Sequence, residues 1–321
     1  MKPRYVVLMV GMNLLWAASY PIFKFLSAQM PSGALATLRF GIAAALILAA
    51  WRWLGGQGPR WSDAPRICAM GVMVFCFAPR LQIEGVHLGK AGDTSLLLGL
   101  DPLITALAAA LFLREKVPAR RWWGCALGMV GVVLLSRVWS GEAEPMRGLL
   151  ANTIFIASFF CESAYSVFAK PILHRCNPLK LLGAGVMVGT LANLVWDATL
   201  DHGATFKALA SINSTAWLLL LYLGIICTVL GYALWLLVIR ETQVNVTGLT
   251  VLVQPLAGLL LSVLWLGERL HWGQFWGSLA ILIGLVIGLR REKGSEGAQP
   301  SDISKIGSGT APTCPVREPV A

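Results

Sequence analysis

Runs of about 20 mostly apolar residues recur along the chain, and short polar stretches separate them. An α-helix needs about 20 such residues to cross the hydrocarbon core of a bilayer. Lipid offers the backbone no hydrogen-bond partner there, so each run must satisfy its own N–H and C=O groups as a helix. The pattern predicts an all-α membrane protein with ten transmembrane helices, at residues 5–26, 33–53, 67–87, 93–113, 121–139, 148–169, 179–200, 215–238, 245–266 and 272–290.

The composition agrees with a chain that lies mostly in lipid. Hydrophobic residues make up 56% of the chain and charged residues 13%, and the mean hydropathy is +0.69. A soluble domain carries about 25% charged residues, so a soluble globular protein is excluded. The net charge of +10 raises the question of nucleic acid. However, the Lys and Arg lie in short loops between apolar runs, where they orient membrane proteins. We expect a lipid bilayer as the surroundings, and no nucleic-acid partner.

The distribution of Lys and Arg predicts the orientation of the chain. Ten spans put both ends on one side of the membrane. With that side taken as cytoplasmic, 16 Lys and Arg lie inside and 6 lie outside. The positive-inside rule therefore predicts a multi-pass protein of the cytoplasmic (inner) membrane with both termini cytoplasmic. Residues 291–321 are rich in Gly, Ser, Pro and Thr and lack apolar periodicity, which predicts a disordered cytoplasmic tail.

An internal repeat divides the chain into two halves. Shifting the sequence by 153 residues lays 97–137 over 250–290 without a gap. An offset of 146 relates the leading helices more weakly. We predict a first repeat at 5–139 and a second repeat at 148–290. The identities at the larger offset include Pro102 and Pro255, Glu115 and Glu268, Trp123 and Trp276, Gly124 and Gly277, and Gly131 and Gly284.

The two halves are expected to point in opposite directions. Each half holds five predicted spans, and an odd number forces the second half to enter the membrane from the other side. The turn after the fourth span is basic, with Arg114, Lys116, Arg120 and Arg121, whereas the equivalent turn after the ninth keeps only Arg269. Such a difference suits loops on opposite faces. Inverted repeats are an architecture of secondary transporters, whose solute site lies between the halves near the midplane.

Several segments resemble a known transporter family. They are Ala91–Glu115 (AGDTSLLLGLDPLITALAAALFLRE), its second copy Gly248–Glu268 (GLTVLVQPLAGLLLSVLWLGE), Leu35–Phe40 (LATLRF) and Gly148–Lys170. Together they resemble the EamA family of the drug/metabolite transporter superfamily, over about residues 5–290. The resemblance implies ten helices in two EamA-type domains and the export or uptake of metabolites. It also implies a cavity lined by the first, third, fourth, sixth, eighth and ninth helices. The polar third helix, with Arg80, Gln82 and Glu84, departs from the family pattern and leaves the substrate open.

Ionisable residues within spans are the first candidates for a solute or ion pathway. Arg80 and Glu84 lie four residues apart on one face of the third helix. From the rise of 1.5 Å per residue, Arg80, Asp101 and Arg39 reach a common depth on three successive helices. We expect a buried cluster in which Asp101 is the counter-charge of Arg80. Intramembrane charges usually mark pathways, although a closed ion-pair network that only fixes helix packing is the alternative.

Two prolines and a group of aromatic residues complete the candidate site. Pro102 and Pro255 are expected to kink their helices, because a proline removes one helical hydrogen bond. The kinks would either shape the bundle only or expose polar backbone beside Asp101 and Gln254. Glu162 lies deep in the sixth span. Trp16, Tyr20 and Tyr165 lie at similar depth and form an aromatic wall around it or simply fill the core.

These features predict a secondary transporter, because the sequence carries no nucleotide-binding motif. We expect it to move small metabolites, amino-acid-like or amphipathic, by alternating access of the two repeats, in the direction of export. Glu84, Asp101 and Glu162 are the candidate proton carriers. The seven scattered cysteines form no metal-ligand pattern, so we expect neither a metal nor a cofactor. A lipid-directed membrane enzyme and a transporter-like sensor are the alternatives, and the chain is expected to be a monomer or a homodimer.

Overall fold

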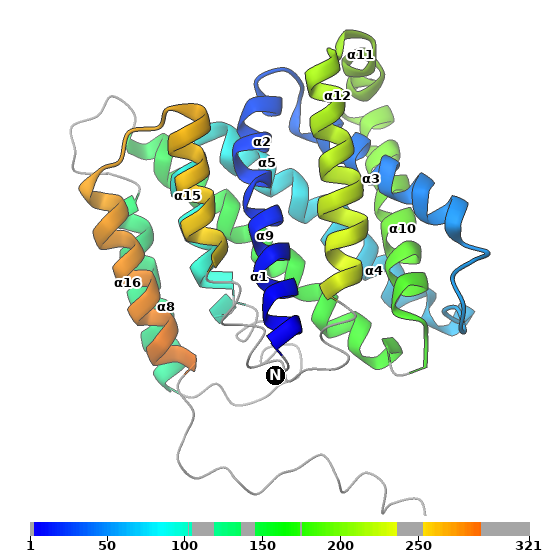
Figure 1. The fold of residues 1–321 in the computed structure, drawn as a ribbon, viewed down its shortest axis with the longest axis horizontal. Helices are drawn as coiled ribbons and strands as arrows, with labels where there is room; N and C mark the ends of the chain where they lie inside the picture. The colour runs from blue at the N-terminus through cyan, green and yellow to red at the C-terminus, as the bar shows by residue number, and fades with distance from the viewer. Residues whose placement is uncertain are drawn as a thin grey trace, which may run out of the picture. The chain divides into compact units, whose positions relative to one another are not determined.

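The computed structural model describes residues 3–101, 103–104, 119–135, 145–173, 175–235 and 253–289. These residues form helices and no strands (Figure 1). Residues up to Leu289 belong to one compact unit. The predicted disordered tail at 291–321 lies outside the described residues. The first half contains α1 (Pro3–Ala17), α2 (Ser19–Ser27), α3 (Ser32–Ala50), η1 (Trp61–Asp63), α4 (Ala64–Val72), η2 (Met73–Phe77), α5 (Ala78–Leu88), α6 (Ala91–Leu97), η3 (Leu98–Leu100) and α8 (Ala119–Leu135).

The second half is helical as well, and most predicted spans have a helical counterpart. Six helical stretches are long and apolar enough to cross a membrane, and each overlaps a predicted span: Val7–Ser27, Ser32–Ala50, Trp61–Leu88, Met146–Tyr165, Pro178–Thr199 and Ser214–Trp235. Trp122–Leu135 and Val253–Leu266 are shorter apolar helices inside two further predicted spans. The helices of the second half are α9 (Pro145–Leu173), α10 (Pro178–Thr199), α11 (Ala204–Ser211), α12 (Ser214–Leu221), η4 (Tyr222–Leu230), α15 (Val253–Leu266) and α16 (Trp272–Leu289).

One helix was not predicted from the apolar pattern. The short α11 lies in the connection between the seventh and eighth predicted spans, where the sequence predicted only a polar stretch. Gly203 precedes it with φ of 74°, a left-handed backbone that glycine adopts without strain. The carboxylate of Asp197 then accepts a hydrogen bond from the Thr205 N–H at 2.9 Å. A carboxylate at this position satisfies a free donor of the first helical turn, which explains why so short a segment is helical.

The last helices of the two halves, α8 and α16, pack closely side by side (Figure 1). A Cβ atom added to Gly131 would lie 2.7 Å from the Gly277 carbonyl oxygen, and one added to Gly277 would lie 2.9 Å from that of Gly131. Likewise, a Cβ atom on Gly284 would lie 2.6 Å from the Gly124 carbonyl oxygen. Residue numbers rise along one helix as they fall along the other, so the pair is antiparallel. Glycine is required here because the two backbones touch.

Charged side chains cap the ends of helices that meet near the turn between α15 and α16. The Glu268 carboxylate accepts hydrogen bonds from the N–H groups of Ala91 and Gly92, both at 2.9 Å, at the start of α6. Lys24 donates to three carbonyl oxygens at the end of α5, at 2.6–3.1 Å. Both contacts suit the helix dipole. Glu268, in the second half, therefore holds a helix of the first half.

Candidate functional site

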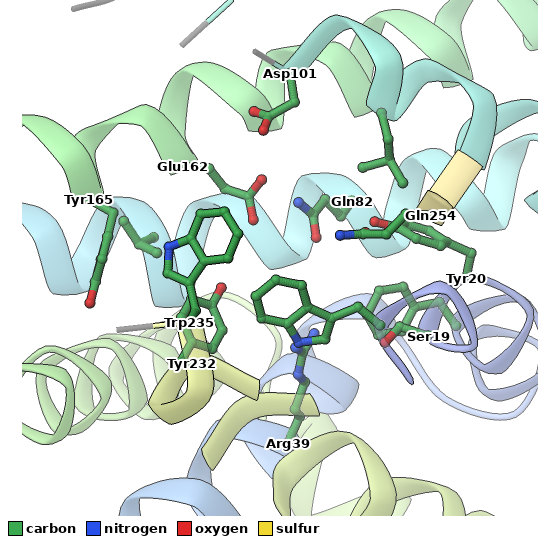
Figure 2. A pocket seen from close by; sticks show the side chains of 14 residues that line it. Ser19, Tyr20, Arg39, Gln82, Asp101, Glu162, Tyr165, Tyr232, Trp235 and Gln254 are labelled. Carbon is green, nitrogen blue, oxygen red and sulfur yellow. The ribbon is translucent and has the colours of Figure 1, made fainter. Parts of the chain in front are cut away.

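A cavity of about 240 Å³ lies among helices of both halves (Figure 2). It is bordered by α1, α2, α3, η2, α5, η3, α9, α15 and the turn of helix that follows η4. Polar, charged and aromatic side chains line it, with few aliphatic ones: Trp16, Ser19, Tyr20, Phe23, Arg39, Val74, Gln82, Leu98, Asp101, Glu162, Tyr165, Tyr232, Trp235 and Gln254.

Irregular backbone surrounds this cavity. The first predicted span breaks at Ala18 between α1 and α2, and the fourth predicted span tightens into the 3-10 turn η3 just before Asp101. The third and eighth predicted spans each contain a π-helical segment, η2 and η4. At membrane depth irregular backbone is tolerated where protein buries it or where it lines a cavity, and π-helical turns concentrate at functional sites. The cavity therefore coincides with the least regular part of four helices.

Two carboxylates approach the cavity from one side. Asp101 follows η3 and Glu162 lies in α9. Figure 2 shows both side chains pointing into the same part of the cavity, with the amide of Gln82 beside them. Two carboxylates so placed form an acceptor-rich wall that suits a cationic group such as an ammonium.

The cation Arg39 faces the cavity from α3 on the opposite side (Figure 2). Its Nε donates to the Thr228 hydroxyl at 3.0 Å. The guanidinium carbon lies 5.4 Å from the centre of the Phe23 ring and 4.9 Å from that of Phe40. No carboxylate among the described residues forms an ion pair with Arg39. Since Nε uses only one of the five guanidinium donors, others remain for an anionic group in the cavity.

Aromatic rings form a third side. Trp16 packs on Tyr232 and Trp235 with ring centres 5.5 and 6.0 Å apart. Tyr165 lies 6.3 Å from Tyr232 by the same measure. These separations are typical of interacting aromatic pairs. The rings give the cavity an apolar surface on which the hydrocarbon part of a solute can pack.

The structure brings most of the predicted pathway residues to this cavity. Seven of the nine line it: Trp16, Tyr20, Arg39, Asp101, Glu162, Tyr165 and Gln254. The amide of Gln254 also donates to the Asn13 side chain at 2.5 Å and so ties α15 to α1. The sequence pattern did not single out Ser19, Phe23, Val74, Leu98, Tyr232 or Trp235, and Gln82 stood out only as a departure from the family. The offset of 153 that pairs Asp101 with Gln254 also pairs Gln82 with Trp235. This pairing was the signal in the sequence that could have identified Gln82 and Trp235.

Arg80 does not have the expected partner. Its Nη1 pairs with the Asp201 carboxylate at 2.9 Å, not with Asp101. Its Nε donates to the Asn193 side chain at 2.9 Å, and the guanidinium carbon lies 4.9 Å from the centre of the Trp196 ring. The expectation of an Arg80–Asp101 pair was therefore wrong. Arg80 faces α10 and the loop that follows it, whereas Asp101 lines the cavity.

The remaining predicted residues are placed as follows. Glu84 is partly buried on α5 and does not line the cavity. Pro255 lies in the first turn of α15, and residues 236–252 just before that helix are outside the described residues, so its kink stays a prediction. Pro102 itself lies outside the described residues. Within the described residues, no group of three His, Cys, Asp or Glu side chains could hold a metal ion.

Comparison with known families gives two matches within the chain. Residues 3–137 and 149–290 each match the EamA-like transporter family. The matches leave out only the connection between the halves and the ends of the chain.

Several named proteins are similar over most of their length. A probable amino-acid metabolite efflux pump of Escherichia coli is 29% identical over 89% of this chain and 96% of its own. A probable terminal-alkyne amino-acid exporter of Streptantibioticus cattleyicolor is 25% identical, over 79% of this chain and 82% of its own. An uncharacterized transporter of Archaeoglobus fulgidus is 24% identical over 90% of this chain and 99% of its own. One crystal structure shares the fold, with a TM-score of 0.59 at 19% identity over 92% of this chain and 100% of its own.

Proposed function

Because the chain belongs to the EamA-like transporter family, we propose that it exports small zwitterionic, amino-acid-like solutes through the cavity between its halves. One observation carries the proposal: a cation and two carboxylates face the same cavity from opposite sides. Arg39 would bind the carboxylate of the solute, for which a guanidinium fork is well suited. Asp101 and Glu162 would bind its ammonium group, and the aromatic side would hold its side chain.

The named relatives support the same class of solute. Both the pump of Escherichia coli and the exporter of Streptantibioticus cattleyicolor are named for amino acids or their metabolites. The family and these relatives are transporters, which favours transport over the membrane-enzyme alternative. Since the sequence carries no nucleotide-binding motif, transport is secondary, driven by the gradient of the solute or of an ion. Glu162 and Asp101 are the candidate proton carriers because they line the cavity, and Glu84 is the weaker candidate.

The proposal includes ten spans arranged as two inverted repeats. Residues that the internal offsets pair contribute to one cavity: Asp101 with Gln254 and Gln82 with Trp235 at 153, Trp16 with Glu162 and Ser19 with Tyr165 at 146. Two halves related by a twofold axis would place equivalent residues around a shared centre. The antiparallel pair α8 and α16 supports this arrangement. The offset of 153 maps Gly131 to Gly284 and Gly124 to Gly277, so the contact of Gly131 with Gly277 and the contact of Gly284 with Gly124 are equivalent.

Counterflow in proteoliposomes tests the proposal whatever the direction of transport and the coupling ion. Vesicles holding purified protein are preloaded with unlabelled solute, and the entry of labelled solute is followed. We choose L-phenylalanine because its ring suits the aromatic side, with phenethylamine and 3-phenylpropionate as probes that lack its carboxylate or its ammonium. A lost hydrogen bond to a charged group costs about 1.5–3 kcal/mol. We therefore expect counterflow of phenylalanine to exceed that of either probe by about tenfold or more.

Protein-free vesicles correct for passive entry of the amine. Equal counterflow of the three compounds would contradict the recognition of a zwitterion. Binding of phenylalanine without any counterflow would instead favour a transporter-like sensor.

A further inference from the structure

The π-helical segment η4 offers two polar groups to the neighbouring helices. Its last turn is π-helical, because the Gly231 N–H donates to the Ile226 carbonyl, five residues back, and also to the Thr228 carbonyl, rather than to that of Cys227. The Cys227 carbonyl accepts a hydrogen bond from the indole N–H of Trp16 at 2.6 Å. Thr228, the next residue, donates its hydroxyl proton to the Leu223 carbonyl, again five residues back, at 2.8 Å. Consecutive residues of η4 therefore point polar atoms outward from the helix.

Those two groups hold two different residues of the cavity. Trp16 comes from α1, and Arg39 comes from α3 and donates from Nε to the Thr228 hydroxyl at 3.0 Å. The hydroxyl of Thr228 thus accepts from Arg39 while it donates to the backbone of η4, which uses both of its functions. Thr228 itself is fully buried and does not line the cavity. Among the described cavity residues, its side chain hydrogen-bonds to Arg39, so we expect it to affect a solute through Arg39.

Two glycines bring α3 and α1 close enough for these contacts. A Cβ atom on Gly224 would lie 3.0 Å from the Arg39 carbonyl oxygen and 2.8 Å from the Ile42 side chain. A Cβ atom on Gly231 would lie 2.5 Å from the indole nitrogen of Trp16. Gly224 and Thr228 contact α3, whereas Cys227 and Gly231 contact Trp16 of α1. Close approach and hydrogen bonds therefore occur together at both contacts.

We propose that η4 positions Arg39 and Trp16 together, and that Thr228 is the positioning residue that sets the preference of the cavity for solutes with a carboxylate. The inference rests on the proposed function. With Nε fixed by Thr228, the guanidinium lies over the rings of Phe23 and Phe40, and within the described residues its other donors remain for the cavity. Without the acceptor, Nε would turn to the nearest polar group. That group would be the solute or a cavity acid, and the guanidinium would no longer be oriented toward the carboxylate of the solute.

The test replaces one hydroxyl and measures selectivity. Thr228→Val keeps the shape of the side chain and removes the acceptor. We expect the counterflow ratio of L-phenylalanine to phenethylamine to fall by about tenfold, from loss of a hydrogen bond to a charged group. Thr228→Ser restores the hydroxyl and should keep the wild-type ratio within about twofold. Thr37→Val is the matched control: Thr37, in α3, is buried too, and among the described residues its hydroxyl bonds only to the Gly33 carbonyl of its own helix.

If Thr228 has only a structural role, Thr228→Val would lower the counterflow of phenylalanine and of phenethylamine in proportion. Their ratio would then be unchanged, which would overturn the inference. An unchanged ratio in Thr228→Val at normal transport would overturn it as well. A wild-type ratio near one would instead contradict the proposed function first. Should Thr228→Val fail to insert, Gly224→Ala tests the same contact by pushing α3 away from η4. It should lower the same ratio, and a wild-type ratio in that variant would also count against the inference.

Discussion

At the scale of single residues, the sequence did not predict the direction in which a side chain points from its helix. The rise per residue put Arg39, Arg80 and Asp101 at one level, and Arg39 and Asp101 do reach one cavity. Arg80 and Gln82 lie two residues apart on the same helix, about 200° around its axis. Gln82 therefore faces the cavity while Arg80 faces α10. One span gives no information on which of these faces points inward, so the sequence selected the wrong one.

The corrected partner of Arg80 can be tested by rescue. Arg80→Gln removes the guanidinium charge and leaves the Asp201 carboxylate without this ion-pair partner. We expect a loss of about 1.5–3 kcal/mol in stability, measured as a lower melting temperature in detergent. Adding Asp201→Asn should recover part of the loss, whereas adding Asp101→Asn should not. Rescue by Asp101→Asn alone would restore the pairing that the sequence suggested. The phenylalanine-to-phenethylamine ratio should stay at its wild-type value, because Arg80 does not line the cavity.

At the scale of helices, the sequence predicted most of the apolar helices but not where they are irregular. The apolar run of the third span reads as one uniform helix, yet the structure inserts η2 within Trp61–Leu88. Hydropathy cannot detect a π-helical turn, since every residue there is apolar in either register. Tertiary contacts hold it instead: the Phe75 carbonyl accepts from the Asn193 side chain at 2.8 Å. In α8 and α16, glycines allow the two helices to pack closely.

The glycine contact between α8 and α16 predicts the direction in which a glycine-to-alanine change shifts the melting temperature. Replacing glycine by alanine inside a helix ordinarily stabilises it by about 0.5–1 kcal/mol. Gly131→Ala should instead lower the melting temperature, because its Cβ would lie 2.7 Å from the Gly277 carbonyl oxygen. Gly11→Ala in α1 is the control, since nothing lies within 4 Å of an added Cβ there. A melting temperature for Gly131→Ala at or above the wild-type value would argue against the antiparallel contact.

At the scale of the whole molecule, the internal repeat was the most informative feature of the sequence. The offset of 153 predicted equivalent positions in the two halves, and Asp101 and Gln254 meet at one cavity. It could not predict how the halves hold each other. Glu268 of the second half caps α6 of the first half. Contacts between residues about 177 positions apart leave no local pattern in the sequence.

Opposite orientation of the halves can be tested by labelling single cysteines. In a background without the seven native cysteines, Ala119→Cys and Leu270→Cys report the equivalent turns after the fourth and ninth spans. Both positions are exposed, whereas a side chain at Gly273 would collide with the Leu134 carbonyl. An impermeant maleimide added to intact cells should label position 270 and leave position 119 unlabelled until the membrane is opened. Labelling of both from the same side would rule out the inverted repeat.

The most direct test of the whole account removes, one at a time, the groups proposed to bind the two ends of the solute, and measures each variant in the counterflow assay. Arg39→Gln should lose the preference for phenylalanine over phenethylamine and keep the preference over 3-phenylpropionate. Glu162→Gln should show the reverse, because the charge facing the solute ammonium is then reduced. Each lost preference should amount to about tenfold. If the two variants change both preferences equally, or change neither, then Arg39 and Glu162 do not bind opposite ends of one solute and the central claim is wrong.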